Sequence, residues 1–227
     1  MLACLQGISR PDLSMAAHQC TRFCSQPMLS HERAVTRIGR YLLDTMDRGL
    51  MCKIDKSKGL ECYVDADFAG GWTPSDPLNP DNALSRSDFV ITYSGVPIFW
   101  RSKLQTEIAL STCEAEYIAL STAMREVIPL MQLLKDLKVN CGVIDTPPQV
   151  YCEVFEDNQS CIAVAELKKP PARTKHIAIK HHHFRNLVDN KTIRISYIDT
   201  KKQLADLLTK PIEDNQFFKL RFMLMGW

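Results

Sequence analysis

The sequence predicts an α/β protein, and three observations support this prediction. Residues 61–70 alternate in the manner of a β-strand, carry two aspartates and stop at Gly70-Gly71. A long stretch from about Thr112 to Lys138 has apolar residues at the three- and four-residue spacing of a helix. A shorter strand-like stretch, Val150 to Phe155, ends in acids just before a helix, which is a favoured position for a site in α/β proteins.

Composition limits the class of protein. With 227 residues, 45% hydrophobic and 24% charged, the chain can bury a substantial core. No apolar run approaches the roughly 18 residues that span a bilayer, and polar residues directly after Leu5 argue against a signal peptide. The nine cysteines are scattered and lack C-x-x-C spacing, so we expect neither a disulfide framework nor a zinc site. We therefore expect a reducing compartment and no membrane partner.

Positive charge is concentrated in one segment although the net charge is only +2. Between Lys168 and Lys202 there are ten Lys or Arg residues against two acids, Asp189 and Asp199, together with four of the six histidines. Such a patch suits a polyanionic partner. A solvated surface of no function is the equally weighted alternative.

Residues 1–50 are predicted to form two helices. The first begins at Arg10-Pro11-Asp12 and ends before Pro27, and the second has Ser30 as its N-cap and ends near Gly49. The opening Met1 to Gly7 fits no element, which suggests a fragment of a longer polyprotein or a start at an internal Met. The polar face of the second helix carries arginines that either touch phosphate or form a plain surface: Arg33, Arg37, Arg40 and Arg48.

The acidic strand places Tyr63, Asp65 and Asp67 on one face and apolar residues on the other. A buried carboxylate costs several kcal/mol unless it is paired or holds a metal ion. The alternative is a solvent-facing edge strand with ordinary surface acids. Periodicity does not choose between Asp65 and Asp67, because they share a face.

The middle of the chain is predicted to hold a loop and a hairpin. Residues 73–82 are too rich in Pro, Asp and Asn for a regular element. Two strands, Phe89 to Tyr93 and Val96 to Trp100, are joined by Ser94-Gly95 as a hairpin. Residues Gln105 to Leu110 read as a further β-like stretch before the long helix.

Helical phase selects one acid at the start of the long helix. The apolar stripe through Leu120 extends backward by four residues to Glu116, whereas Glu114 lies about 120° away from it. Glu116 is therefore predicted to face the sheet. Glu114 better suits a role in capping or in the helix dipole.

The last third of the chain supplies two more candidate acids. Asp157 follows the strand of residues 150–155, and capping of the next helix, Cys161 to Leu167, is its alternative role. Asp206 lies in a helical stretch from Gln203 to Lys210. The other expected elements are a helix over residues 179–189, a strand over residues 192–198 and a closing helix over residues 215–224.

Asp65, Glu116, Asp157 and Asp206 thus come from four elements. Hard divalent cations prefer oxygen ligands, and two Mg²⁺ ions about 4 Å apart can hold the attacking and leaving oxygens of a phosphodiester. Taken alone this set is weak support, because a chain with 26 acids offers many quartets.

Seven motifs, in order, resemble the ribonuclease H domain of copia-type LTR retrotransposon Pol polyproteins. Residues 59–227 resemble that domain, and residues 1–50 resemble the helical tail of the connection region of the preceding reverse transcriptase. The motifs are Tyr-Val-Asp-Ala-Asp-Phe-Ala-Gly (63–70), Ser-Arg-Ser (85–87), Trp-Arg-Ser-Lys (100–103), Ala-Leu-Ser-Thr-Cys-Glu-Ala-Glu-Tyr (109–117), Glu-Asp-Asn-Gln-Ser (156–160), Arg-Thr-Lys-His-Ile (173–177) and Gln-Leu-Ala-Asp-Leu-Leu-Thr-Lys-Pro (203–211).

The resemblance implies a five-stranded mixed sheet flanked by helices, with the N-terminal helical pair beside it. It also implies an endonuclease that cuts the RNA strand of RNA/DNA hybrids with two Mg²⁺ ions, for which Mn²⁺ can substitute. Asp65 and Asp157 would bridge or bind the ions, Glu116 would bind one, and Asp206 would complete the second site. The resemblance favours Asp65 over Asp67.

The same resemblance implies partners and a location. Nucleic acid would be bound by Asn158, Lys103, Arg173, Lys175 and Lys180. The other partner would be the remainder of the reverse transcriptase and Pol polyprotein, in cytoplasmic virus-like particles with possible nuclear entry.

The sequence also departs from the family at two places. Ser85-Arg-Ser-Asp88 and the long loop of residues 74–82 differ from the usual pattern, which puts the hairpin near the substrate in doubt. Three consecutive histidines, 181–183, cannot all reach one ion from a helix. We expect His183 to pack against Phe184, with His182 a weak candidate for product release.

Two other functions compete with the nuclease. The first is a catalytically silent module for nucleic-acid binding or assembly within the polyprotein. An integrase-type nuclease fits less well, because integrases place their third acid on a late helix whereas Glu116 opens a long internal helix.

Overall fold

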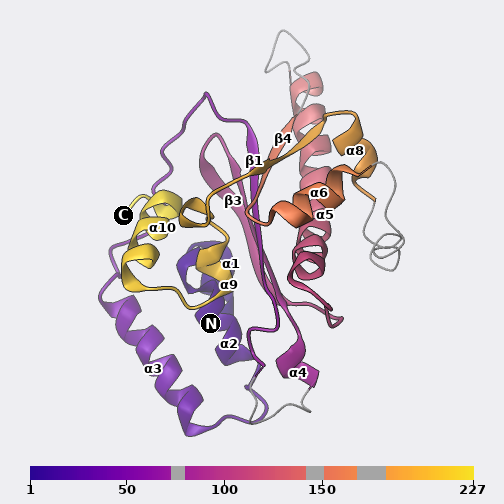
Figure 1. The fold of residues 1–227 in the computed structure, drawn as a ribbon. Coiled ribbons are helices and arrows are strands. Elements are labelled where there is room, and N and C mark those ends of the chain that lie inside the picture. Colours follow the sequence, from indigo (N-terminus) through magenta and orange to yellow (C-terminus); the bar gives the residue numbers. More distant parts are fainter. Residues whose placement is uncertain (73–79, 142–150, 168–182) are drawn as a thin grey trace.

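Five strands form one mixed sheet at the centre of the molecule, as the computed structural model shows for residues 1–72, 80–141, 151–167 and 183–227 (Figure 1). The order across the sheet is β3-β2-β1-β4-β5. β1 pairs antiparallel with β2 and parallel with β4, and is therefore a central strand. The expected five-stranded mixed sheet is confirmed, and a solvent-facing edge position for β1 is excluded. The strands are β1 Leu60–Asp67, β2 Arg86–Tyr93, β3 Val96–Leu104, β4 Cys152–Glu156 and β5 Ile193–Tyr197.

The β2–β3 hairpin forms where the sequence predicts it. Its two turn residues, Ser94 and Gly95, have φ values of 51° and 77°, as a tight hairpin of this twist requires. The prediction of a further strand over Gln105 to Leu110 is wrong. The chain leaves the sheet after β3, and Ile108 and Leu110 are exposed without a neighbouring strand to pair with.

In the described part of the chain, three helices cover one face of the sheet: α5 Thr112–Asn140, α6 Gln159–Glu166 and α8 Arg185–Asp189. α5 packs against β1 and β2. The alternate residues Cys62 and Val64 of β1 point into this layer and are fully buried with Leu120 of α5. The larger apolar core of the described chain lies here, because the stripe on α5 meets the apolar faces of the strands.

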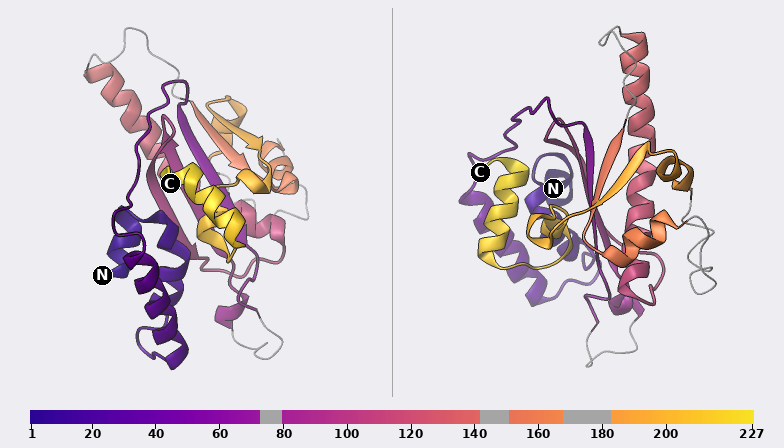
Figure 2. Two further views of the ribbon diagram at one scale, coloured as in Figure 1. Left: turned by 90° about the vertical axis from the view of Figure 1, so that its left-hand side faces the viewer. Right: turned by 45° about the horizontal axis from the view of Figure 1, so that its top comes forward.

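The opposite face is covered by the two ends of the chain (Figure 2). From the C-terminal end come α9 Asp206–Thr209 and α10 Asp214–Met225. From the N-terminal end come four elements: α1 Leu2–Ile8, η1 Pro11–Leu13, α2 Ser14–Thr21 and α3 Leu29–Leu43. α2 contacts both β3 and α9. A second core forms around Tyr63, Val90, Trp100, Leu208 and Leu220.

Polar contacts join the N-terminal helices to α10. Arg10 and Asp12 form a buried ion pair at 2.8 Å. The Tyr41 hydroxyl donates to Asp12 Oδ2 at 2.7 Å and accepts from Arg221 Nη1 at 3.0 Å. The Trp227 indole N–H donates to the Gly49 carbonyl at 2.8 Å. Residues 1–50 are thus an integral part of this layer.

Two details of the N-terminal region differ from prediction. Residues 2–8 form α1, and the Trp100 indole N–H donates to the Gln6 carbonyl at 2.7 Å, a tertiary contact that local periodicity does not reveal. α3 begins at Leu29 with Met28 as its N-cap, not Ser30, because the Met28 N–H donates to His31 Nδ1. α3 also ends at Leu43, before the expected Gly49.

Two further elements correct the expected boundaries. A short helix, α4 Pro80–Ala83, occupies the end of the loop that was expected to be irregular, and proline is well suited to the first position of a helix. The predicted helix from Gln203 is replaced by η3 Thr200–Lys202 and the shorter α9. Gln203 is extended because its buried amide donates to the carbonyls of Val64 and Phe155.

Membrane spans were not expected from the sequence. In the part of the chain that the structure describes, none of the helices combines the length and the apolar character needed to cross a bilayer.

Candidate active site

Asp65 lies near the end of β1, on the face that carries Tyr63 and faces α9. Only 2% of the residue is exposed, and its Oδ2 atom accepts no hydrogen bond. A strand whose apolar residues face the opposite core must place its intervening residues here. The fold therefore buries this carboxylate without hydrogen-bonding all of it.

Glu116 lies in the second turn of α5 and points toward the sheet, as helical phase predicts. The Ser111 hydroxyl caps the helix by accepting from the Glu114 N–H, and the Glu114 carboxylate accepts from the Leu110 N–H at 2.9 Å. Glu114 thus has the capping role. Glu116 is 6% exposed, and its Oε2 atom has no hydrogen-bond partner.

Asp157 is the first residue after β4. Because β4 runs parallel to β1, Asp157 lies at the same end of these strands as Asp65. The alternative role of capping α6 belongs to the next residue, since Asn158 Oδ1 accepts from the Cys161 N–H at 3.1 Å. Asp157 instead accepts from the Thr200 hydroxyl at 2.7 Å, which fixes its side chain beside η3. Its carboxylate remains half-exposed.

These three acids converge on one point. Asp65, Glu116 and Asp157 each offer a carboxylate oxygen, and the three oxygens lie within 4.8 Å of one another. Asp67 is not in this group, so the structure selects Asp65 from the two candidates on that face. We call Asp65, Glu116 and Asp157 the carboxylate triad.

The electrostatics of the triad favour a bound cation. Burial, and then the neighbouring carboxylates Glu156 and Asp65, raise the pKa of Glu116 well above its ordinary value. Burial and the charge of Asp65 likewise raise the pKa of Asp157, although the Thr200 hydrogen bond acts against this. A divalent cation would remove this repulsion, and three oxygen donors are the set that Mg²⁺ or Mn²⁺ prefers.

Asp206 is placed differently from the triad. It is the first residue of α9 and is 2% exposed. Its Oδ1 atom lies 2.9 Å from the Lys210 ammonium, which also lies 3.7 Å from Asp65 Oδ2. Burial and the charge of Asp65 raise the pKa of Asp206 to about 7. Although burial opposes it, the carboxylates of Asp65 and Asp206 raise the pKa of Lys210.

Sequence reasoning missed two buried acids near the triad. Glu156, at the end of β4, is fully buried, and burial followed by the charge of Asp157 raises its pKa well above the ordinary value. Alternation along β4 could have shown that it shares the core-facing side of Cys152 and Val154. Asp88 is fully buried opposite Asp65 in the neighbouring strand. The signal for Asp88 was the departure of residues 85–88 from the family pattern.

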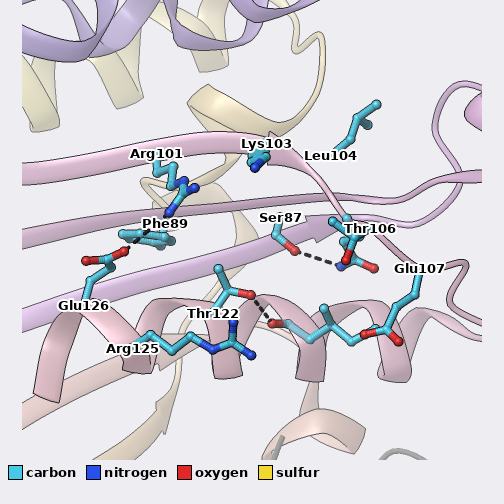
Figure 3. Close-up of a pocket in the computed structure, with 12 residues that line it drawn as sticks. Ser87, Phe89, Arg101, Lys103, Leu104, Thr106, Glu107, Thr122, Arg125 and Glu126 are labelled. Carbon is cyan, nitrogen blue, oxygen red and sulfur yellow. Dashed lines mark hydrogen bonds and ion pairs between the residues drawn. The ribbon is translucent and has the colours of Figure 1, made fainter. Parts of the chain in front are cut away.

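The structure describes only two of the five residues that are expected to contact nucleic acid. Asn158 caps α6, as described above. Lys103 lies at the end of β3, beside a pocket of about 190 Å³ between β3 and α5 (Figure 3). Arg101 and Arg125 also line this pocket, and Arg101 reaches Glu126 at 3.4 Å. Arg173, Lys175 and Lys180 lie outside the described residues.

The three histidines are also placed only in part. His181 and His182 lie outside the described residues. The ring of His183 packs edge-on against Phe184, with centroids 5.6 Å apart, and Phe184 is fully buried. The expected packing pair is confirmed.

Comparison with known proteins shows that the sequence is similar to retrotransposon polyproteins. No family model matches the chain. Over 209 residues, 92% of the chain, the sequence is 37% identical to the Retrovirus-related Pol polyprotein from transposon TNT 1-94 of Nicotiana tabacum. It is 32% identical over 211 residues, 93% of the chain, to the corresponding polyprotein from transposon RE1 of Arabidopsis thaliana.

The chain spans only 14% and 13% of the lengths of these two polyproteins. Among solved structures, LC11-RNase H1 isolated from compost aligns with a TM-score of 0.40 at 20% identity, over 66% of this chain and 92% of that one.

Proposed function

Because the chain belongs to the copia-type retrotransposon Pol polyproteins, we propose that it is a ribonuclease H that cleaves the RNA strand of RNA/DNA hybrids during reverse transcription. The fold and the polyprotein relatives support a nuclease role of the ribonuclease H type. The observation that carries the proposal is the carboxylate triad, whose three acids come from β1, α5 and the end of β4.

The site fits divalent cations. Asp65 Oδ2 and Glu116 Oε2 are buried and accept no hydrogen bond, so a cation bound there would supply the partner that these oxygens lack. Asp65 and Asp157 would bridge or hold the ions, Glu116 would bind one of them, and Asp206 would complete a second position. When bound, such ions supply an activated water molecule and neutralise charge that develops on the phosphodiester.

The protein's own residues would position the site and the nucleic acid. The capping bonds of Ser111 and Glu114 set the start of α5 and so the direction of Glu116. The Thr200 hydroxyl orients Asp157. Asn158, Lys103 and the basic segment from Lys168 to Lys202 would contact the hybrid, so affinity should fall steeply with salt. Contacts to 2′-hydroxyls would distinguish RNA from DNA.

We also propose an origin for each of two parts of the chain, and a location in the cell. Residues 1–50 would be the tail of the reverse transcriptase connection region and residues 59–227 the ribonuclease H domain. The remainder of the polyprotein would be the protein partner, in cytoplasmic virus-like particles.

The direct test is Mg²⁺-dependent cleavage of an RNA/DNA hybrid labelled on its RNA strand. We expect the purified chain to cut only the RNA of the hybrid, and Asp65→Asn and Glu116→Gln to abolish cutting. Asp136→Asn is the matched control, because it neutralises an exposed acid of the same helix, α5, that lies outside the triad.

One result would reject the nuclease, and another would reject the triad as its site. If the chain binds hybrid in a salt-sensitive way and never cuts it with Mg²⁺ or Mn²⁺, it is a binding module. If the triad variants cut as well as the unaltered chain, the cutting activity lies elsewhere.

A further inference from the structure

Lys210 occupies a position between two of the candidate ligands. Its ammonium lies 2.9 Å from Asp206 Oδ1 and 3.7 Å from Asp65 Oδ2. Both carboxylates are almost completely buried, whereas the Lys210 side chain is 36% exposed. A positive charge therefore already stands where the two acids face each other.

The four acids consequently form two unequal groups. Asp65, Glu116 and Asp157 bring oxygens within 4.8 Å of one another, and Lys210 approaches this group at Asp65, at 3.7 Å. Asp206 is tied to Lys210, one turn later in the chain, and lies outside that group. Asp65 belongs to both groups.

We propose that Lys210 is a built-in counter-ion that holds the place of the second cation, so that the Asp65–Asp206 position accepts a divalent ion only after Lys210 moves away. The inference rests on the proposed function, since it concerns the same acids. It makes the two cation positions unequal, with the triad filled first.

The surroundings give the Lys210 side chain a place to go. Lys210 lines a cavity of about 770 Å³ between α2, α3 and α10. The acids Asp44 and Asp214 line the same cavity. An ammonium leaving Asp206 would thus have space and carboxylates nearby. Because α2 and α3 form one wall of this cavity, the N-terminal helices also border the path of the lysine.

The test measures cation binding without nucleic acid and without catalysis. Mn²⁺ would be titrated calorimetrically into the unaltered chain, Lys210→Met and Lys210→Arg, and the melting temperature of each would be recorded in EDTA and in Mn²⁺. Lys219→Met is the matched control, because Lys219 is an exposed lysine of α10, outside the segment proposed to contact nucleic acid.

We expect the unaltered chain to bind one Mn²⁺ well and a second one weakly. Removing the competing charge in Lys210→Met should tighten the second site by about tenfold or more. The same variant should melt lower in EDTA, because Asp65 and Asp206 then face each other unpaired, and gain more from Mn²⁺. Lys210→Arg, which keeps the charge, and Lys219→Met should behave like the unaltered chain.

Each other result has a definite meaning. If Lys210→Met melts lower in EDTA but binds Mn²⁺ as the unaltered chain does, Lys210 is only a structural partner and the inference is wrong. If Lys210→Met does not fold, a Lys210→Arg chain with altered Mn²⁺ stoichiometry would also reject it, whereas unaltered stoichiometry supports the role of the charge. If the unaltered chain binds no Mn²⁺ at all, the proposed function itself fails.

Discussion

The two faces of the central sheet bury neighbouring residues of the same strand, with opposite effects on stability. Val64 of β1 is fully buried in the apolar core beneath α5. Asp65, the next residue, is 2% exposed on the other face, with one carboxylate oxygen that accepts no hydrogen bond. Burying the valine stabilises the fold, whereas burying the carboxylate costs stability.

This comparison explains how the molecule tolerates its acidic site. The α5 face supplies the larger core, and the second face adds a smaller one in which Leu208 and Leu220 surround the sheet. The triad lies at the carboxyl ends of the parallel strands β1 and β4, between the two helical layers. We therefore expect substitutions in the triad to affect activity and substitutions under α5 to affect stability.

The largest expected effect is on activity, from Glu116→Gln. Losing this carboxylate should reduce hybrid cleavage by about a thousandfold or more. In EDTA the variant should melt at the same or a higher temperature, because a neutral amide relieves the repulsion among buried acids. Cleavage rates and thermal melts of the same preparation would check this, and a variant that melts much lower would contradict the stated cost of the acid.

The next effect is on stability, from Leu120→Ala in the middle of α5. Leu120 is fully buried, so the truncation should lower the free energy of unfolding by about 3 kcal/mol. Cleavage by the folded fraction should be unchanged. Leu133→Ala, on an exposed part of the same helix, should change stability by less than about 0.5 kcal/mol in denaturant titrations.

A smaller effect should appear in the pH dependence of the metal-free chain. Burial and the charge of Asp65 raise the pKa of Asp206 to about 7 in the folded protein, from the ordinary aspartate value of 3.8. Between these values the unfolded chain releases a proton that the folded chain keeps, so stability is lost as the pH rises from about 4 to about 7. The loss should be on the order of 2 kcal/mol, less than the roughly 4 kcal/mol that the full shift would give, because solvent screens the interaction.

Comparison with Asp206→Asn isolates this contribution. The variant cannot titrate at this position, so its stability relative to the unaltered chain should rise between pH 5 and pH 7.5. Equal differences at the two pH values, measured in EDTA, would show that Asp206 ionises normally.

The smallest effect concerns the hydrogen bonds of Tyr41, which link the N-terminal helices to α10. Tyr41→Phe removes the hydroxyl that donates to Asp12 and accepts from Arg221. We expect a loss of about 1 kcal/mol in the free energy of unfolding, with cleavage preserved. Tyr197→Phe, at an exposed position, is the control. Equal free energies of unfolding for the two variants would mean that the hydrogen bonds of Tyr41 add nothing to stability.

The sequence predicts the parts of the fold that depend on local pattern. Strand alternation and helical phase identify β1, the hairpin and α5, and phase alone separates Glu116 from Glu114. The pattern does not determine which of Asp65 and Asp67 joins the triad, because that depends on how β1, α5 and β4 meet in space.

The errors have the same physical origin. α1 is fixed by a tertiary hydrogen bond from Trp100, and Gln203 is extended by hydrogen bonds to two strands. Residues 105–110 have strand-like composition but no strand to pair with. The Lys210 contact was equally hidden, because a lysine four residues after an aspartate is common on any helical surface.

The most direct test of the central claim is the location of Mn²⁺ in crystals of the chain, read from its anomalous scattering. We expect a strong peak among the carboxylates of Asp65, Glu116 and Asp157, at about 2.0–2.5 Å from their oxygens. Peaks confined to surface acids, with none at the triad, would contradict it.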